Sequence, residues 1–184
     1  MKKLLLFFLF FTSLNAQEQL YFGLGSSYMK EVFTSLDAKD TSLHTRFKIG
    51  YGDIKAYAVE LSIESMKNSS KIFSAPSSNS LDGDKLGLNI ELLKAFDFDI
   101  YLYPFVRAGF GTGSMDISRE LQKSLSYGSF NLGAGVFIPL YKNVDVELGY
   151  EYRSISYEAI DTIITKNSYK SNANALFFGF NARF

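Results

Sequence analysis

The sequence has no cysteine, no tryptophan and a single histidine among its 184 residues. The absence of cysteine excludes a disulfide framework, and it equally excludes a lipoprotein anchored through a lipidated cysteine. Cysteine and histidine are also the side chains that most often bind transition metals. We therefore expect neither a metal site nor a cofactor.

A surplus of charge of either sign is missing as well. The chain has 19 Lys and Arg side chains against 19 Asp and Glu side chains. A nucleic-acid-binding protein would need a basic surface. No nucleic-acid partner is therefore expected.

A long hydrophobic run of the kind that forms a membrane-spanning helix is not evident. Residues 4–14 are an apolar stretch of 11 residues, whereas a spanning helix needs about 20. Lys2 and Lys3 precede this stretch and Ala16 follows it, which is the layout of a cleaved secretory signal peptide. We expect residues 1–16 to be this signal and residues 17–184 to be the mature domain. Loss of the two lysines leaves 17 basic and 19 acidic side chains, a formal charge of 17 − 19 = −2.

The mature chain shows alternation of apolar and polar residues with a period of two, which is typical of strands with one apolar and one polar face. In the clearest segment, Val59, Leu61 and Ile63 alternate with Glu60 and Glu64. Eight strands are predicted, at residues 20–29, 43–51, 55–66, 86–92, 100–111, 130–138, 144–153 and 173–184.

The predicted connections alternate in length. Short turns fall near residues 52–53, 95–97 and 139–143, and longer polar stretches cover residues 31–40, 67–84, 112–126 and 154–172. Outer-membrane barrels have short periplasmic turns and long extracellular loops. The pattern predicts an all-β fold: an eight-stranded antiparallel up-and-down transmembrane β-barrel with both chain ends in the periplasm.

Alternation by itself also fits a soluble barrel of lipocalin type, in which the apolar face points inward. Three features favour the inverted, membrane arrangement: a polar face that combines glycine with charges of both signs, Tyr and Phe near strand ends, and an apolar final strand. Because eight strands enclose only enough space for side chains, opposite charges are expected to pair inside. The predicted lumen charge network comprises Arg46, Lys48, Glu60, Glu64, Glu91, Arg107, Glu147, Glu151, Arg153 and Arg183.

Two segments carry a resemblance to known outer-membrane proteins. The final strand is similar to the signal read by the barrel-assembly machinery, with Gly179 and Phe184 at matching positions, whereas Phe177 and Ala182 depart from the usual polar and aromatic residues. Residues 103–113 (YPFVRAGFGTG) resemble a strand of the OmpA/OmpX-like eight-stranded barrel family, a porin-like outer-membrane β-barrel domain. The resemblance implies location in the outer membrane of a Gram-negative envelope, contact with its lipid and lipopolysaccharide, and assembly by that machinery.

Barrels of this size also include lipid A deacylases and palmitoyltransferases, which place a histidine with serine and acidic partners near the outer rim. Ser42 and His44 are two residues apart and therefore share one strand face, the minimum arrangement for a nucleophile and its base. No complete triad can be assigned from the sequence, so we do not expect an enzyme.

The hypothesis that follows is a barrel with a structural or surface-interaction role, which would bind any extracellular ligand through its four long loops. A narrow channel is a variant of this hypothesis. The alternatives from other classes are a lipid A-modifying enzyme built around His44 and a soluble, lipocalin-like exported binding protein.

Overall fold

The computed structural model describes residues 18–34, 38–53, 55–68, 70–75, 78–119, 122–161, 166–167 and 169–184. The predicted signal peptide at residues 1–16 lies outside the described residues. The described residues form ten strands: β1 (Gln19–Phe33), β2 (Lys39–Gly52), β3 (Tyr57–Met66), β4 (Lys85–Ala95), β5 (Tyr103–Asp116), β6 (Ser124–Tyr141), β7 (Val144–Tyr157), β8 (Ile160–Asp161), β9 (Lys166–Asn167) and β10 (Lys170–Arg183).

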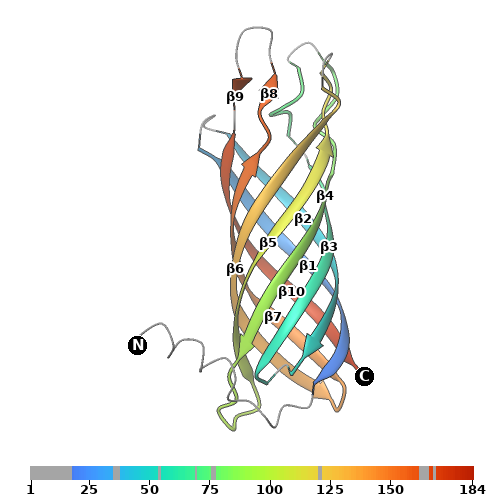
Figure 1. Cartoon of the computed structure of the whole chain (residues 1–184), viewed down its shortest axis with the longest axis vertical. Helices are drawn as coiled ribbons and strands as arrows, with labels where there is room; N and C mark the ends of the chain where they lie inside the picture. The colour runs from blue at the N-terminus through green and yellow to red at the C-terminus, as the bar shows by residue number, and fades with distance from the viewer. Residues whose placement is uncertain are drawn as a thin grey trace, which may run out of the picture.

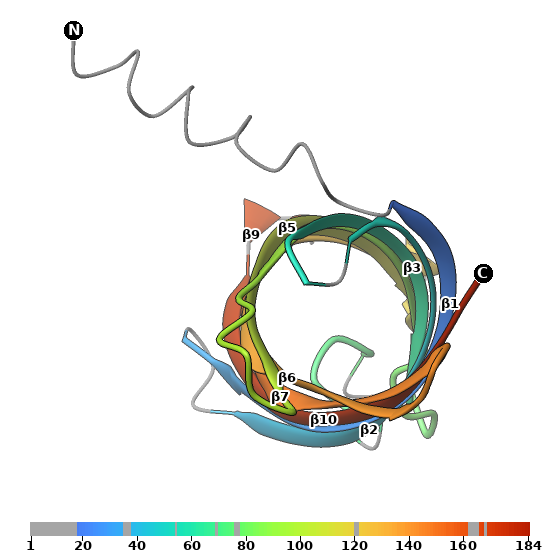
Figure 2. The same ribbon diagram turned by 90° about the horizontal axis from the view of Figure 1, so that it is seen from below.

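The eight long strands close into one barrel in the order β1-β10-β7-β6-β5-β4-β3-β2 (Figures 1 and 2). Every neighbouring pair is antiparallel, and the short strands β8 and β9 pair with each other outside the barrel. The first and last long strands pair over 13 residue positions, from Tyr21 opposite Arg183 to Phe33 opposite Ser171. This closure removes the open edge that a sheet would otherwise expose. The predicted eight-stranded up-and-down barrel is confirmed.

The strands are longer at the loop end than the sequence predicted. β1 and β2 together cover half of the expected loop at residues 31–40, and β5, β6, β7 and β10 extend in the same way into the expected loops 112–126 and 154–172. At the turn end, the strand expected from residue 100 begins at Tyr103. Asp99 there adopts a left-handed φ of 57°, and its backbone N–H donates to the Asp97 carboxylate at 3.1 Å, so the preceding residues form a turn.

In the middle of the barrel, aliphatic and aromatic rows face outward and ionised rows face inward. Leu24 and Phe110 are 60% and 65% exposed, whereas Arg107 and Glu60 are 3% and 1% exposed. Large apolar side chains on the outer face of a closed barrel are the arrangement of a protein surrounded by lipid. The soluble lipocalin-like alternative is therefore wrong.

This polarity reverses at the loop end, which the sequence analysis did not anticipate. Along β7, Leu148, Tyr150 and the partly exposed Tyr152 face outward. Beyond them the outward residues are Ser154 and Ser156, and the buried Ile155 between these two faces inward. The barrel wall thus continues past the lipid with a polar outer face and an apolar interior. The expected loops were assigned there because the alternation in the sequence changes phase where the surrounding medium changes from lipid to water.

Two apolar clusters fill the ends of the barrel. The loop-end cluster consists of Met29, Phe33, Met66, Phe73, Met115, Ile117, Leu125, Tyr127, Ile155, Tyr157, Ile160, Ala173 and Ala175. The turn-end cluster consists of Tyr21, Ala58, Leu93, Ala95, Phe105 and Phe137, with Tyr103 and Phe177 packed against it. The ion pairs of Arg46, Arg107 and Arg153 lie between these two clusters.

Candidate functional site: the barrel lumen

Charged side chains enter the lumen at positions where a neighbouring strand contributes little or no side chain. Arg107 lies opposite Gly133 on β6, and Glu91 lies opposite Gly109 on β5. A Cβ atom added at Gly133 would lie 2.9 Å from the Arg107 Cγ, and one added at Gly109 would lie 2.7 Å from the Glu91 Cγ. Glycine therefore provides the space that long charged side chains need in a narrow barrel.

Arg153 connects opposite walls of the barrel. Its Nη2 lies 2.7 Å from Oε2 of Glu64 on β3, its Nη1 donates to the other oxygen of the same carboxylate, and its Nε donates to Glu151. This two-pronged pairing fits the planar guanidinium of arginine. Arg153 is 1% exposed, so its charge is compensated by these carboxylates and not by bulk water.

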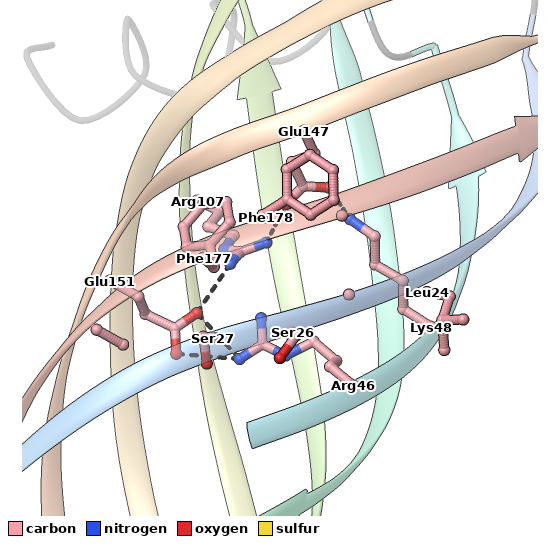
Figure 3. A pocket seen from close by; sticks show the side chains of 13 residues that line it. Leu24, Ser26, Ser27, Arg46, Lys48, Arg107, Glu147, Glu151, Phe177 and Phe178 are labelled. Carbon is pink, nitrogen blue, oxygen red and sulfur yellow. Dashed lines mark hydrogen bonds and ion pairs between the residues drawn. The ribbon is translucent and has the colours of Figure 1, made fainter. Parts of the chain in front are cut away.

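Arg46 and Arg107 extend the network around the barrel (Figure 3). Arg46 Nη2 lies 3.0 Å from Glu151 Oε1 and 3.3 Å from Glu64 Oε2, and its Nη1 lies 3.5 Å from Glu91 Oε2. Arg107 donates to Glu147 at 2.8 Å and to Glu151 at 2.9 Å. Glu151 thus accepts from three arginines, which cross-link strands β2, β5 and β7 through one carboxylate.

Lys48 completes the network toward the turn end. Its Nζ lies 2.7 Å from Glu60 Oε1 and also contacts the Glu147 carboxylate. The Tyr21 hydroxyl donates to the same Glu60 oxygen at 2.7 Å. We call the nine connected residues the central charge network: Arg46, Lys48, Arg107, Arg153, Glu60, Glu64, Glu91, Glu147 and Glu151.

Arg183, the tenth residue of the predicted set, lies apart from this network. Its Nη2 pairs with Asp145 Oδ1 at 2.6 Å near the turns.

A cavity of about 30 Å³ lies beside Arg46, Lys48 and Arg107, where Gly25 of β1 pairs with Gly179 of β10. That volume holds on the order of one or two water molecules, so this cavity leaves little free space beside the three cations.

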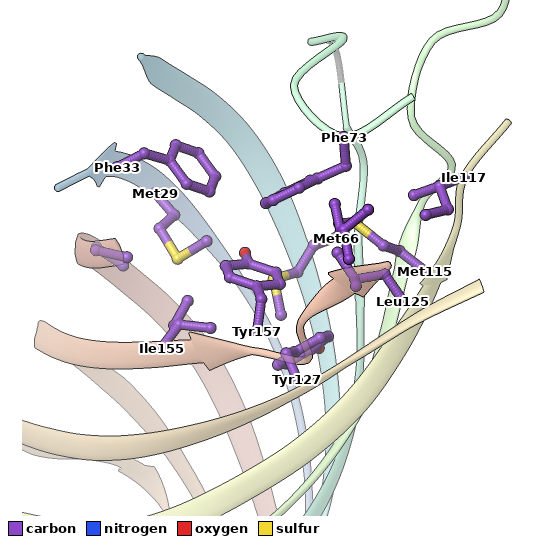
Figure 4. Close-up of a cluster of buried hydrophobic side chains, with 13 residues drawn as sticks. Met29, Phe33, Met66, Phe73, Met115, Ile117, Leu125, Tyr127, Ile155 and Tyr157 are labelled. Atoms are coloured by element: carbon purple, nitrogen blue, oxygen red, sulfur yellow. The ribbon is translucent and has the colours of Figure 1, made fainter. Parts of the chain in front are cut away.

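A second buried polar group, which the sequence analysis missed, contacts Tyr157 of the loop-end cluster drawn in Figure 4. Glu31 Oε2 lies 2.6 Å from Lys85 Nζ, and the Tyr157 hydroxyl donates to Glu31 Oε1 at 2.6 Å. Ser171 also donates to this carboxylate. Glu31 lies in the predicted loop at residues 31–40, and Lys85 lies one residue before the predicted strand at residues 86–92. The alternation of Met29, Glu31 and Phe33 along one strand face was the signal that could have found it.

The structure places Ser42 and His44 inside the barrel. Both face the lumen from β2, with exposed fractions of 8% and 1%. His44 Nδ1 lies 4.0 Å from Glu64 Oε2, and His44 Nε2 has no hydrogen-bond partner among the described residues. In the sheet, His44 of β2 pairs with Ser27 of β1 on one side and with Met66 of β3 on the other. The imidazole therefore lies between the central charge network and the loop-end cluster, away from the lipid-facing surface.

The two residues of the predicted assembly signal lie on the closing strand and directly after it. Gly179 pairs with Gly25 across β10 and β1. Phe184 is exposed, its backbone N–H donates to the Leu20 carbonyl, and its ring contacts the Phe22 ring at a centroid distance of 5.8 Å.

No helix among the described residues is long and apolar enough to cross a membrane. In the same part of the chain, no three or more His, Cys, Asp or Glu side chains are grouped so that they could hold a metal ion.

A closed barrel with a lipid-compatible outer belt and ionised groups inside is the architecture of an integral outer-membrane protein. The sequence matches the model of the outer membrane protein beta-barrel domain over residues 4–184. The chain belongs to this family, and the outer membrane is its location. No curated protein matches the sequence significantly.

Solved structures are similar in fold. Neisserial surface protein A is 17% identical, with a TM-score of 0.65 over 90% of this chain and 97% of that chain. Ail, the attachment invasion locus protein of Yersinia pestis, is 17% identical, with a TM-score of 0.53 over 91% of this chain and 99% of that chain. The Ail structure contains the heparin analogue sucrose octasulfate. At these identities the similarity shows the shared barrel fold.

Proposed function

We propose that this protein is a closed, non-enzymatic outer-membrane barrel that acts through its loop-end surface, and that its lumen serves as a structural core. The observation that carries this proposal is the filled lumen. The loop-end cluster, the central charge network and the turn-end cluster follow one another along the barrel axis. A solute would have to displace buried side chains in each of these layers.

The loop end is held shut by the segment between β3 and β4. Phe73 is 1% exposed, and its ring lies 4.8 Å from the Tyr157 ring and 5.4 Å from the Phe33 ring, measured between centroids. The Asp82 carboxylate accepts hydrogen bonds from the backbone N–H groups of Ile72, Phe73 and Ser74 at 2.6–2.8 Å. These bonds fix the backbone in the conformation that inserts Phe73 into the barrel mouth.

The turn end is closed by stacked aromatic rings. Phe105 and Phe137 lie with their ring centroids 4.4 Å apart, and the Arg107 guanidinium lies 4.2 Å from the Phe177 ring centroid. This cation–π contact joins the turn-end cluster to the central charge network. Such continuity of packing favours a rigid scaffold over a channel.

Conductance in planar lipid bilayers tests the closed lumen. We expect the folded protein to give no steady single-channel conductance under conditions in which a general porin does. Folding would be established beforehand by heat-modifiable migration on an SDS gel. Steady conductance from the folded, unsubstituted protein would refute the closed lumen and support the narrow-channel alternative.

We propose that His44 has no catalytic role. Its burial supports this, because an acyl ester in the membrane could not reach an imidazole enclosed by the barrel wall. The test is His44→Ala expressed in a strain lacking the native protein, with lipid A examined by mass spectrometry. Identical lipid A with and without the imidazole is expected. A lipid A species that depends on His44 would establish the enzyme alternative.

The remaining parts of the proposal concern export and partners. Residues 1–16 would be cleaved as a signal peptide, and Gly179 and Phe184 would be read by the barrel-assembly machinery. The mature barrel would contact outer-membrane lipid and lipopolysaccharide around its belt, and an extracellular ligand would bind through the loops that connect the strands at the loop end.

A further inference from the structure

The polar outer face at the loop end is not uniformly charged. Lys30 on β1, Lys39 on β2 and Lys170 on β10 are all exposed on neighbouring strands. The acidic residues beside the first two, Glu31 and Asp40, are buried inside the barrel. Among the described residues, the outer face of these three strands is therefore basic above the apolar belt.

Other parts of the same end carry both signs of charge. Exposed residues there include Lys67, Asp84, Asp116, Lys123 and Glu158. Mixed charges of this kind are typical of a solvated surface. The sector formed by β2, β1 and β10 differs because its exposed charges have one sign.

Directly below this basic sector, the lipid-facing surface has a groove of about 750 Å³ across strands β1, β2, β6, β7 and β10. Tyr28, Leu43, Tyr150, Leu176 and Phe178 are the large side chains along it. Its depth comes from small residues: Ser26 and Ala134 are exposed on the outer face, and Gly135 pairs with Gly149 in the wall beneath. In a membrane, hydrocarbon must fill such an apolar groove, because water does not enter the bilayer core to do so.

The three lysines lie beyond the loop-end edge of the groove, at successive levels along the strands. Tyr28 at the groove edge pairs with Leu43 on one side and with Leu176 on the other. Lys30 is two residues beyond Tyr28 on the same strand face, which is about 7 Å along a strand. Lys39 and Lys170 lie on the strands either side of β1, two strand spacings or about 10 Å apart across the sheet. They are also staggered along the strands, because Lys39 pairs with Val32 and the Lys170 carbonyl accepts from the backbone N–H of Thr34.

We propose that this face binds one molecule of a glycolipid that carries two phosphates, with an acyl chain in the groove and the phosphates at Lys30, Lys39 and Lys170. The inference rests on the proposed orientation, in which the loop end faces the outer leaflet. Two phosphates are specified because the lysines span more than one phosphate group would. Ammonium groups near a membrane surface attract anionic headgroups. The groove, by binding an acyl chain, determines where on the outer surface of the barrel the lipid is bound.

The test is native mass spectrometry of the folded protein in a neutral detergent with added diphosphoryl lipid A. We expect one bound molecule, weaker binding of the dephosphorylated lipid, and a reduction of about tenfold for Lys30→Gln/Lys39→Gln. Lys67→Gln/Lys123→Gln removes the same charge elsewhere at the loop end and should bind like the unsubstituted protein. Equal losses in the two double variants, or no loss in either, would overturn the proposal.

The groove is tested independently of charge. Ala134→Phe places a ring in the groove and should weaken lipid A binding, whereas Ala108→Phe makes the same change at an exposed position on β5 and should not. Unchanged binding by Ala134→Phe would also overturn the proposal. These readouts do not depend on a closed lumen, so a conducting barrel and a failed lipid site are distinguishable outcomes.

Discussion

Glu60 and Glu91 face each other directly across the pair β3–β4, and both are buried. Glu60 Oε2 and Glu91 Oε1 have no hydrogen-bond partner among the described residues. The central charge network to which they belong contains five carboxylates and four cations, an excess of one acid. Like charges at directly opposite positions are unfavourable, so this pair is where the network is least well compensated.

The first prediction concerns this excess. Glu91→Gln should change the free energy of unfolding by no more than about 1 kcal/mol, because its ion pairs, at 3.5 and 3.9 Å, are long and the network becomes balanced. Glu64→Gln should cost about 3 kcal/mol, because it leaves Arg153 without its two-pronged partner. Urea unfolding in lipid vesicles, followed by circular dichroism, measures both. Equal costs would contradict the uneven compensation.

The second prediction concerns glycine at a crowded interior position. A Cβ atom at Gly50 would overlap the Tyr21 ring, whose hydroxyl donates to Glu60. Gly50→Ala should therefore cost about 1–3 kcal/mol through overpacking. Gly128→Ala is the matched control, since its nearest neighbouring atom would lie 3.9 Å away, and it should be neutral or slightly stabilising. A neutral Gly50→Ala in the same unfolding assay would mean that the ring has room to move.

The third prediction concerns the segment that closes the barrel mouth. Phe73→Ala should lower the free energy of unfolding by about 3–5 kcal/mol, because it leaves a cavity in the loop-end cluster. Phe98→Ala, in the exposed turn between β4 and β5, should cost little. Hydrogen exchange would also be faster at residues 72–74 in Phe73→Ala. If hydrogen exchange at residues 72–74 were as slow in Phe73→Ala as in the unsubstituted protein, the Asp82 hydrogen bonds would be sufficient to hold this segment in place without the Phe73 ring.

The fourth prediction locates the edge of the lipid belt. Ile90 faces outward within the belt and Ser156 faces outward beyond it. Ile90→Arg should cost about 2–4 kcal/mol in a bilayer, whereas Ser156→Arg should cost about 0–1 kcal/mol. Unfolding from vesicles distinguishes the two variants. A large penalty at Ser156 would mean that the hydrocarbon reaches the loop-end cluster.

The strand number, the antiparallel order and the outward direction of the aliphatic rows could be predicted from the sequence. Alternation with a period of two is local, so a row such as Val59, Leu61 and Ile63 defines one face of its strand without reference to other strands. That this face points to lipid was indicated by the glycine and mixed charges of the opposite face, the aromatic residues near strand ends and the apolar final strand. The charged residues of the lumen could be identified in the same way, because Arg46 and Glu64 stand on the polar face of their strands.

The pairing of these charges was decided only by the tertiary structure. Arg153 and Glu64 are separated by 89 residues, and a one-residue change of strand register would direct either side chain to lipid. The loop-end reversal also required the fold. The side chains of Ser154, Ile155 and Ser156 continue to point alternately outward and inward, but here the apolar residue faces inward, because water and not lipid lies outside the wall. That boundary is a property of the assembled barrel and not of any single strand.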